Sequence, residues 1–233
     1  MKFIHCSDIH LDSPMESNLT AEQARERNTE ICRTFSRMVD FAKAEGVQAI
    51  LLAGDVFDTD RISATTARYI LDTVAQASDI CFLYIMGNHD EAHRAFSGQT
   101  LPDNLITFGA DWGYRSFGNV TVAGIELTDR NCHSLYDNLQ MDPDHLNIVM
   151  LHGQVSTQPG EELIALPLLK NKDVDYLALG HIHSYQQEKL DDRGNWCYCG
   201  CLEGRGFDEC GEKGFVLLDV QPGKITSEFV PFA

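Results

Sequence analysis

The chain has 233 residues, of which 43% are hydrophobic, so it can build a sizeable core and is not expected to be disordered. Its 18 basic and 35 acidic residues leave a net charge of −17. That balance argues against tight, unaided binding to long nucleic acid, because such surfaces are usually basic. No apolar run is long enough to span a bilayer, and the N-terminus lacks the apolar core of a signal peptide. We therefore expect a cytoplasmic protein without membrane contact.

Strand and helix patterns alternate in the first part of the chain. Thr20 and Gln23 form a capping box that predicts the start of a helix, and Gly46 is expected to end it near residue 45. Ser63 is expected to start a second helix. Continuous apolar runs predict buried strands at residues 3–6, 49–53 and 81–86.

The second part of the chain is richer in strands. Short strands and turns are expected from 105 to 127, and a hairpin loop at 192–195. A short helix is expected at 161–169. Further strands are predicted at residues 147–151, 176–179, 185–190, 196–199, 215–220 and 225–230. This order predicts an α/β protein: a sandwich of mixed sheets flanked by helices, forming a single domain over residues 1–233.

The eight cysteines do not suggest disulfides in a cytoplasmic chain of this size. Cys197, Cys199 and Cys201 alternate, which places three thiols on one strand face. Zinc sites usually use a C-x2-C spacing instead. We interpret these cysteines as reduced structural thiols, with a thiolate metal site as the alternative.

Polar residues that can bind metals follow five of the predicted strands. In open α/β sheets, ligands bind at the carboxyl ends of the strands. Each group alone is a weak signal, but five strand ends carrying five such groups indicate one common site. The candidates are Asp8, His10, Asp55, Asn88, His89, His152, His181 and His183.

These residue types favour two divalent ions and chemistry at phosphorus. The aspartate Asp55 has two oxygens and can bridge two ions, while Asn88 offers a neutral oxygen. Two ions about 3.5–4 Å apart can acidify a bridging water and stabilise an in-line displacement. His89 can face the substrate and protonate the departing oxygen. Asp58 and Asp90 either orient the imidazoles or lie in solvated loops.

The order of these motifs resembles that of the calcineurin-like metallophosphoesterases. The matching motifs are D-x-H at 8–10, G-D-x-x-D at 54–58, G-N-H-D at 87–90, H-G at 152–153 and G-H-x-H at 180–183. The resemblance implies a four-layer α/β/β/α sandwich of mixed sheets, with His89 as the catalytic acid. It also implies two ligand sets: Asp8, His10, Asp55 and His183 for one ion, and Asp55, Asn88, His152 and His181 for the other.

A finer resemblance is to the SbcD-type DNA-repair exonuclease subunits. It rests on residues 3–11, on Gly54 to Asp58 and on the segment 202–215. It implies manganese as the ion, with iron and zinc also suited to the ligands, and a homodimer. The chain ends at Ala233, where those nucleases continue into a DNA-capping domain and a segment that binds a coiled-coil ATPase. A coiled-coil ATPase partner is expected if this is part of such a nuclease; otherwise we expect a small stand-alone phosphodiesterase.

The expected function is hydrolysis of phosphodiesters, either DNA ends or small molecules, by attack of a metal-bridging hydroxide. A phosphomonoesterase or nucleotide phosphatase on the same site is the alternative. A metal-free scaffold is a third interpretation, which the presence of Asp55, Asn88 and His89 opposes. His93 either lines the pocket or lies on the surface, and Arg205 either reaches a phosphate or forms a salt bridge.

Overall fold

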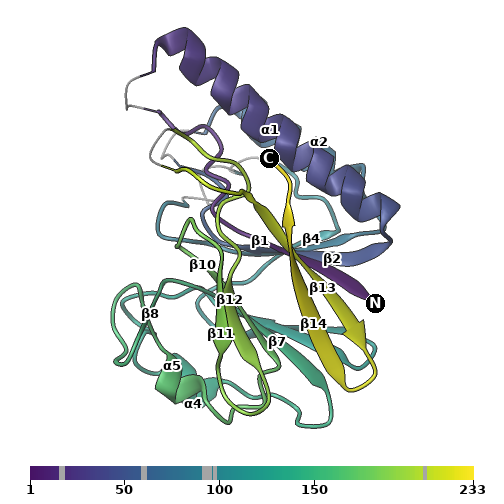
Figure 1. Cartoon of the computed structure of the whole chain (residues 1–233), viewed down its shortest axis with the longest axis vertical. Coiled ribbons are helices and arrows are strands. Elements are labelled where there is room, and N and C mark those ends of the chain that lie inside the picture. Colours follow the sequence, from purple (N-terminus) through teal and green to yellow (C-terminus); the bar gives the residue numbers. More distant parts are fainter. Residues whose placement is uncertain (16–18, 59–61, 91–95, 97–98, 207–208) are drawn as a thin grey trace.

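The protein is described by a computed structural model that covers residues 1–15, 19–58, 62–90, 96, 99–206 and 209–233 (Figure 1). Two six-stranded mixed sheets stack face to face, and helices cover their outer faces. In the first sheet, four parallel strands run in the order β1 (Lys2–Cys6), β2 (Val47–Ala53), β3 (Cys81–Ile85) and β4 (Leu105–Thr107). The antiparallel strands β13 (Gly214–Gln221) and β14 (Lys224–Pro231) extend this sheet beyond β1.

The second sheet repeats the same plan. Its four parallel strands run in the order β12 (Asn195–Tyr198), β10 (Tyr176–Gly180), β7 (Leu146–His152) and β6 (Val120–Gly124). One antiparallel strand lies at each edge, β11 (Gln186–Lys189) beside β12 and β5 (Gly113–Phe117) beside β6. A separate pair of short strands is formed by β8 (Gln154–Ser156) and β9 (Leu163–Ala165).

The helices lie on the outside of the sandwich. In Figure 1, α1 (Ala21–Ala44) and α2 (Ala64–Ala75) cover the first sheet, and α4 (Leu135–Asn138) and α5 (Leu166–Leu169) cover the second. The predicted capping box at Thr20 and Gln23 is present, and the Ser63 side chain caps α2. The long helix ends just before Gly46, whose φ of 64° turns the chain into β2.

Three apolar clusters separate the four layers. Along β2, Ile50 and Leu52 face the cluster under α1, whereas Leu51 and Ala53 face the cluster between the two sheets. Along β7, alternate residues divide in the same way between the inter-sheet cluster and the one under α4 and α5. Because strand side chains alternate between faces, continuous apolar runs are what a doubly covered strand requires. The predicted four-layer α/β/β/α sandwich is confirmed.

The helix predicted at 161–169 is wrong over its first half. Leu163 to Ala165 instead pair in parallel with β8, and the helix begins only at Leu166. Pro167, which lacks an N–H group, lies in the first turn of α5, where no hydrogen bond is lost. The buried side chains of Ile164 and Ala165 satisfy a strand as well as a helix, so the apolar pattern alone did not distinguish the two.

The two sheets meet at the carboxyl ends of their parallel strands. The His152 ring, at the end of β7, lies with Nδ1 2.9 Å from the carbonyl oxygen of Ala53, at the end of β2. The backbone N–H of His181, after β10, donates to the carboxylate of Asp8, after β1, at 3.0 Å. Both contacts join residues from different sheets and bring the predicted site residues to one edge of the sandwich. No helix within the residues described is both long enough and apolar enough to cross a membrane.

Candidate metal centre

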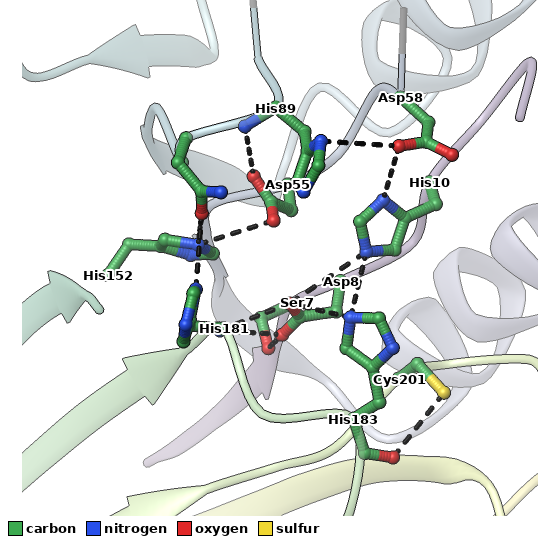
Figure 2. Close-up of polar contacts among 12 residues, drawn as sticks. Ser7, Asp8, His10, Asp55, Asp58, His89, His152, His181, His183 and Cys201 are labelled. Carbon is green, nitrogen blue, oxygen red and sulfur yellow. Dashed lines mark hydrogen bonds and ion pairs between the residues drawn. The ribbon is translucent and has the colours of Figure 1, made fainter. Parts of the chain in front are cut away.

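All the predicted ligands lie at this edge, in loops that follow the strands (Figure 2). Two groups of side chains have ligand atoms within 4.8 Å of one another: Asp8 with His10 and His183, and Asp8 with Asp55 and His152. Asp8, His10, Asp55 and His152 are buried, whereas His181 and His183 are half-buried and Asn88 and His89 are exposed. The site therefore has a buried carboxylate and imidazole floor with an open side.

In the first group, two imidazole nitrogens face each other. The Nε2 atoms of His10 and His183 are 3.0 Å apart, and Asp8 Oδ1 lies 4.0 Å from the first and 3.6 Å from the second. On the far side of each ring, Nδ1 faces a carboxylate: Asp58 at 3.3 Å from His10 and Glu209 at 2.7 Å from His183. A carboxylate is an acceptor, so it favours the proton on Nδ1 and leaves the lone pair on Nε2.

The second group has the same property. His152 Nδ1 faces the carbonyl of Ala53, which only accepts, so this nitrogen carries the proton. Its Nε2 lone pair then faces Asp55 Oδ2 at 3.3 Å and Asn88 Oδ1 at 3.0 Å. Asn88 Oδ1 also lies 3.2 Å from Nδ1 of His181. A lone pair, a carboxylate and an amide oxygen are thus directed at the same space.

Lone pairs directed at one another repel unless a cation or a proton lies between them. Buried carboxylates, imidazoles and an amide oxygen are ligands that manganese, iron and zinc accept. The acceptors in both groups therefore fit divalent ions. Asp8 belongs to both geometric groups, whereas the resemblance assigned the shared position to Asp55. Bridging by Asp55 stays a prediction.

Without an ion, protons take up part of this charge imbalance. Burial alone would lower the pKa of His152, but the Asp55 carboxylate outweighs burial and raises that pKa to about 9. Burial alone would raise the pKa of Asp55, but the hydrogen bond and charge of His152 hold it well below its usual range. The pair is therefore ionised in the metal-free protein, and an ion that binds His152 must displace its proton.

The motif glycines allow the ligands to come this close. A Cβ on Gly87 would lie 2.1 Å from Asp55 Oδ1, and one on Gly54 would lie 2.2 Å from His152 Nδ1. The backbones of Asp8, His10 and Asp55 have φ near 51°, a conformation that residues other than glycine rarely adopt. Such strain concentrates at functional sites.

His89 lies at the open side of the centre. Its side chain is 54% exposed, and Nδ1 lies 3.6 Å from Asp58 Oδ1, while its backbone N–H donates to Asp55 Oδ1 at 2.9 Å (Figure 2). Burial alone would raise the pKa of Asp58, but hydrogen bonding with His10 and Ser13 and the charges of His10 and Arg205 lower it to about 2. Asp58 is therefore an anion that faces both His10 and His89.

Asp90 does not orient an imidazole, although this was one interpretation of its position. Its carboxylate accepts hydrogen bonds from the backbone N–H groups of Val56, Phe57 and Gly87. Burial raises its pKa to about 6, although the N–H groups of Gly87 and Phe57 oppose the shift. Asp90 thus fixes the loop after β3 to the loop after β2, the two loops that carry Asn88 and Asp55.

Sequence reasoning gave no role to Glu209, which contacts His183. Burial alone would raise its pKa, but hydrogen bonds from His183 and Arg205 hold it well below its usual range. Its place in the segment 202–215 was the only signal in the sequence. Arg205 forms salt bridges with Glu209 and Asp58, as one of its two interpretations expected. His93 lies outside the described residues.

The three alternating cysteines and His5 agree with structural roles. The thiols of Cys197, Cys199 and Cys201 are buried, and burial raises the pKa of each, to about 12 for Cys197 and about 11 for Cys201. Neutral, buried thiols are poor metal ligands. His5 is fully buried with Nδ1 2.9 Å from the hydroxyl of Tyr176.

Comparisons with known proteins agree with this geometry. The family described as Calcineurin-like phosphoesterase matches residues 1–185. An uncharacterized metallophosphoesterase of Bacillus subtilis, YhaO, is 29% identical over 98% of this chain and 60% of its own length. The DNA double-strand break repair protein Mre11 of Sulfolobus acidocaldarius is 29% identical over 82% of this chain and 52% of its own. The SbcD component of the SbcCD nuclease of Escherichia coli is 26% identical over 97% and 67%. The chain thus spans little more than half of the first two relatives.

Solved structures support the fold alone, since their identity to this chain is low. A dimetal phosphatase from Danio rerio has a TM-score of 0.57 at 12% identity, covering 100% of this chain and 99% of its own. An archaeal phosphodiesterase has a TM-score of 0.53 at 12% identity, covering 99% and 100%. With a family match over most of its length and relatives among the Mre11 and SbcD nucleases, this chain belongs to the calcineurin-like phosphoesterases and is a phosphoric ester hydrolase.

Proposed function

We propose that the protein is a phosphodiesterase of the exonuclease-like branch of its family, acting on DNA ends or small phosphodiesters. The observation that carries this proposal is the pair of acceptor clusters centred on Asp8, in which imidazole lone pairs and carboxylates face one another. The relatives named as nucleases and break-repair proteins support the choice of phosphodiesters over monoesters.

The ligand sets proposed are those implied by the family resemblance. Asp8, His10 and His183 hold the first ion, and Asn88, His152 and His181 hold the second, with Asp55 shared between them. Manganese is the ion we propose. When bound, the pair supplies Lewis-acid activation of water and neutralises charge on the phosphoryl group.

His89 is proposed to protonate the departing oxygen. Its exposed ring stands at the open side of the centre, and the Asp58 carboxylate lies on its Nδ1 side. That anion stabilises the doubly protonated ring and leaves the Nε2–H directed away from Asp58, toward a bound substrate. Asp58 therefore acts on the leaving group only through His89.

The charge of −17 bears on how the substrate is held. A strongly acidic chain repels a phosphate backbone except where bound cations reverse the local field. We propose that the metal centre itself supplies most of the attraction for the scissile phosphate. This favours short substrates or ends over long DNA.

The experiment is hydrolysis by the manganese-loaded protein of three substrates: end-labelled linear DNA, bis(p-nitrophenyl) phosphate and p-nitrophenyl phosphate. The His89→Ala variant is the control for contaminating activity. Cleavage of both diesters, lost in the variant, supports the proposal. Turnover of the small diester with intact DNA restricts it to small molecules. Turnover of the monoester alone favours the phosphomonoesterase alternative and overturns the proposal.

Three further expectations also stay proposals. They are a single domain over residues 1–233, a cytoplasmic location and a homodimer. A coiled-coil ATPase partner is likewise a proposal, because the chain spans only 52–60% of the first two relatives it matches.

A further inference from the structure

We infer that Arg205 is a positioning residue that joins the ligands of the first ion to the general acid, so that one guanidinium holds both in place. The inference rests on the proposed function, because it assigns Arg205 a role in that same centre. Arg205 comes from the segment between β12 and β13, far in sequence from the loops that carry Asp58 and His89.

The guanidinium bridges two carboxylates. Its Nη1 donates to Asp58 Oδ2 at 3.1 Å, and its Nη2 and Nε donate to Glu209 Oε1 at 2.8 and 3.1 Å. Nη2 also lies 3.3 Å from His183 Nδ1. All three nitrogens are therefore engaged within the described residues, so the guanidinium is not free to grip a phosphate.

Each bridged carboxylate in turn contacts the centre. Asp58 Oδ1 faces Nδ1 of His10 at 3.3 Å and Nδ1 of His89 at 3.6 Å. Glu209 Oε1 faces Nδ1 of His183 at 2.7 Å. Partners of this kind fix the orientation of a ligating imidazole and the nitrogen that carries its proton. Through two carboxylates, Arg205 thus acts on both imidazoles of the first group and on the general acid.

The segment that carries Arg205 is itself held firmly. Arg27 of α1 donates to the carbonyl of Gly204 at 2.8 Å and pairs with Glu203 at 2.6 Å. Lys213 donates to the carbonyl of His183 at 3.0 Å. The Arg205 side chain is 26% exposed, and the carboxylates of Asp58 and Glu209 are 10% and 9% exposed. Neither carboxylate therefore has much water to replace the guanidinium if it is removed.

An arginine suits this position better than a lysine. Its planar fork offers donors in several directions at once and can engage two carboxylates, whereas an ammonium group is a compact point charge. Two buried carboxylates without the guanidinium between them would repel each other and move apart, and the imidazoles that they face would move with them.

The test uses Arg205→Gln, with Arg193→Gln as a matched control. Arg193 also bridges two carboxylates, Asp173 and Asp175, and its side chain is 29% exposed, but these carboxylates lie outside the metal centre. Manganese binding is measured by calorimetry on the metal-free proteins. We expect Arg205→Gln to weaken one of two binding steps by about 10–100-fold, the usual effect of removing an outer partner, and Arg193→Gln to leave both unchanged.

A second readout concerns the acid, measured with aryl diesters whose leaving phenols differ in acidity. Arg205→Gln should make the rate depend more steeply on leaving-group acidity, because His89 is no longer held in place. Glu209 pairs with His183 and with the guanidinium of Arg205. Glu209→Gln should therefore steepen the dependence through Arg205, and should add nothing further in the Arg205→Gln background. A merely structural role for Arg205 would lower rates without changing this dependence.

If Arg205→Gln fails to fold, Arg205→Lys replaces it, with a smaller loss of manganese affinity and the same steepening expected. Unchanged manganese binding and an unchanged leaving-group dependence in the folded variant would overturn the inference alone. An equal loss in Arg193→Gln would also overturn it. A wild-type protein that bound no manganese and cleaved no diester would overturn the proposed function, and the inference with it.

Discussion

The Nε2 atoms of His10 and His183 lie 3.0 Å apart, although each ring has its Nδ1 turned to a carboxylate. A ring whose Nδ1 proton is held by a carboxylate presents a lone pair at Nε2. Two such lone pairs at this distance are unfavourable unless a cation joins them. The folded chain therefore places unfavourable contacts where an ion would be bound, and the ion contributes to stability by removing them.

The first prediction concerns metal binding and stability. Adding manganese to the metal-free protein should raise Tm, because the ion binds the folded state only. At an ion concentration of about 100 times Kd the gain is about 2.7 kcal/mol. For a chain of this size that gain corresponds to about 5–10 °C in Tm. Differential scanning calorimetry checks it, with His183→Gln expected to lose most of the shift. Equal shifts in the variant and the wild type would contradict the ligand assignment.

The second prediction separates the acid from the ligands. His89→Ala should keep both ions but lose most turnover on substrates with poor leaving groups, by about 10²–10⁴-fold. Asp55→Asn should lose metal as well as activity. Metal content by elemental analysis and single-turnover rates distinguish the two variants. Full activity of His89→Ala on a diester with a poor leaving group would remove His89 from the mechanism.

The third prediction concerns close packing around Asp55. Gly87→Ala places a Cβ 2.1 Å from Asp55 Oδ1, so the carboxylate must move. We expect a loss of manganese affinity of about 10-fold or more, the scale seen when the support of a ligand is removed. Gly109→Ala is the matched control, because a Cβ there meets nothing within 4 Å. Calorimetric titration of both variants checks this, and equal affinities would show that the loop adapts.

Much of this site was predictable because the sheet edge gathers it. Apolar runs located the strands, and the residues that follow β1, β2, β3, β7 and β10 do lie together. The reason given for Asp8 and His10 was incomplete, however. Their two-residue spacing was taken as strand alternation, but both residues have φ of 51° and lie beyond the end of β1. A strained loop, and not an extended strand, aims both side chains.

Other features had no local signal in the sequence. Glu209 and Arg205 reach the centre across the fold, and nothing in their neighbourhood along the chain indicates a contact with His183 or Asp58. The short helix at α5 was placed too early because buried apolar residues suit a strand or a helix equally. Long-range contacts and short elements are where tertiary structure decides.

The last prediction concerns His5 and the pH dependence of stability. Burial lowers the pKa of His5 from 6.5 to about 3, although a hydrogen bond with the backbone of Leu179 opposes the shift. Between these two values the unfolded chain binds a proton that the folded chain excludes. His5 therefore contributes stability that is present above pH 6.5 and is lost as the pH falls toward about 3, with a slope of up to about 1.4 kcal/mol per pH unit.

The His5→Gln variant has no titrating group at this position and can still bond to the hydroxyl of Tyr176, which lies 2.9 Å from His5 Nδ1. The free energy of unfolding in urea, measured on metal-free protein across this pH window, should fall less steeply in the variant than in the wild type. His133→Gln, at an exposed histidine, controls for the loss of an imidazole elsewhere. Because all other titrating groups are shared, the difference between the two slopes isolates His5. Parallel curves for wild type and His5→Gln would mean that the buried ring is protonated at the same pH in the folded and unfolded chain.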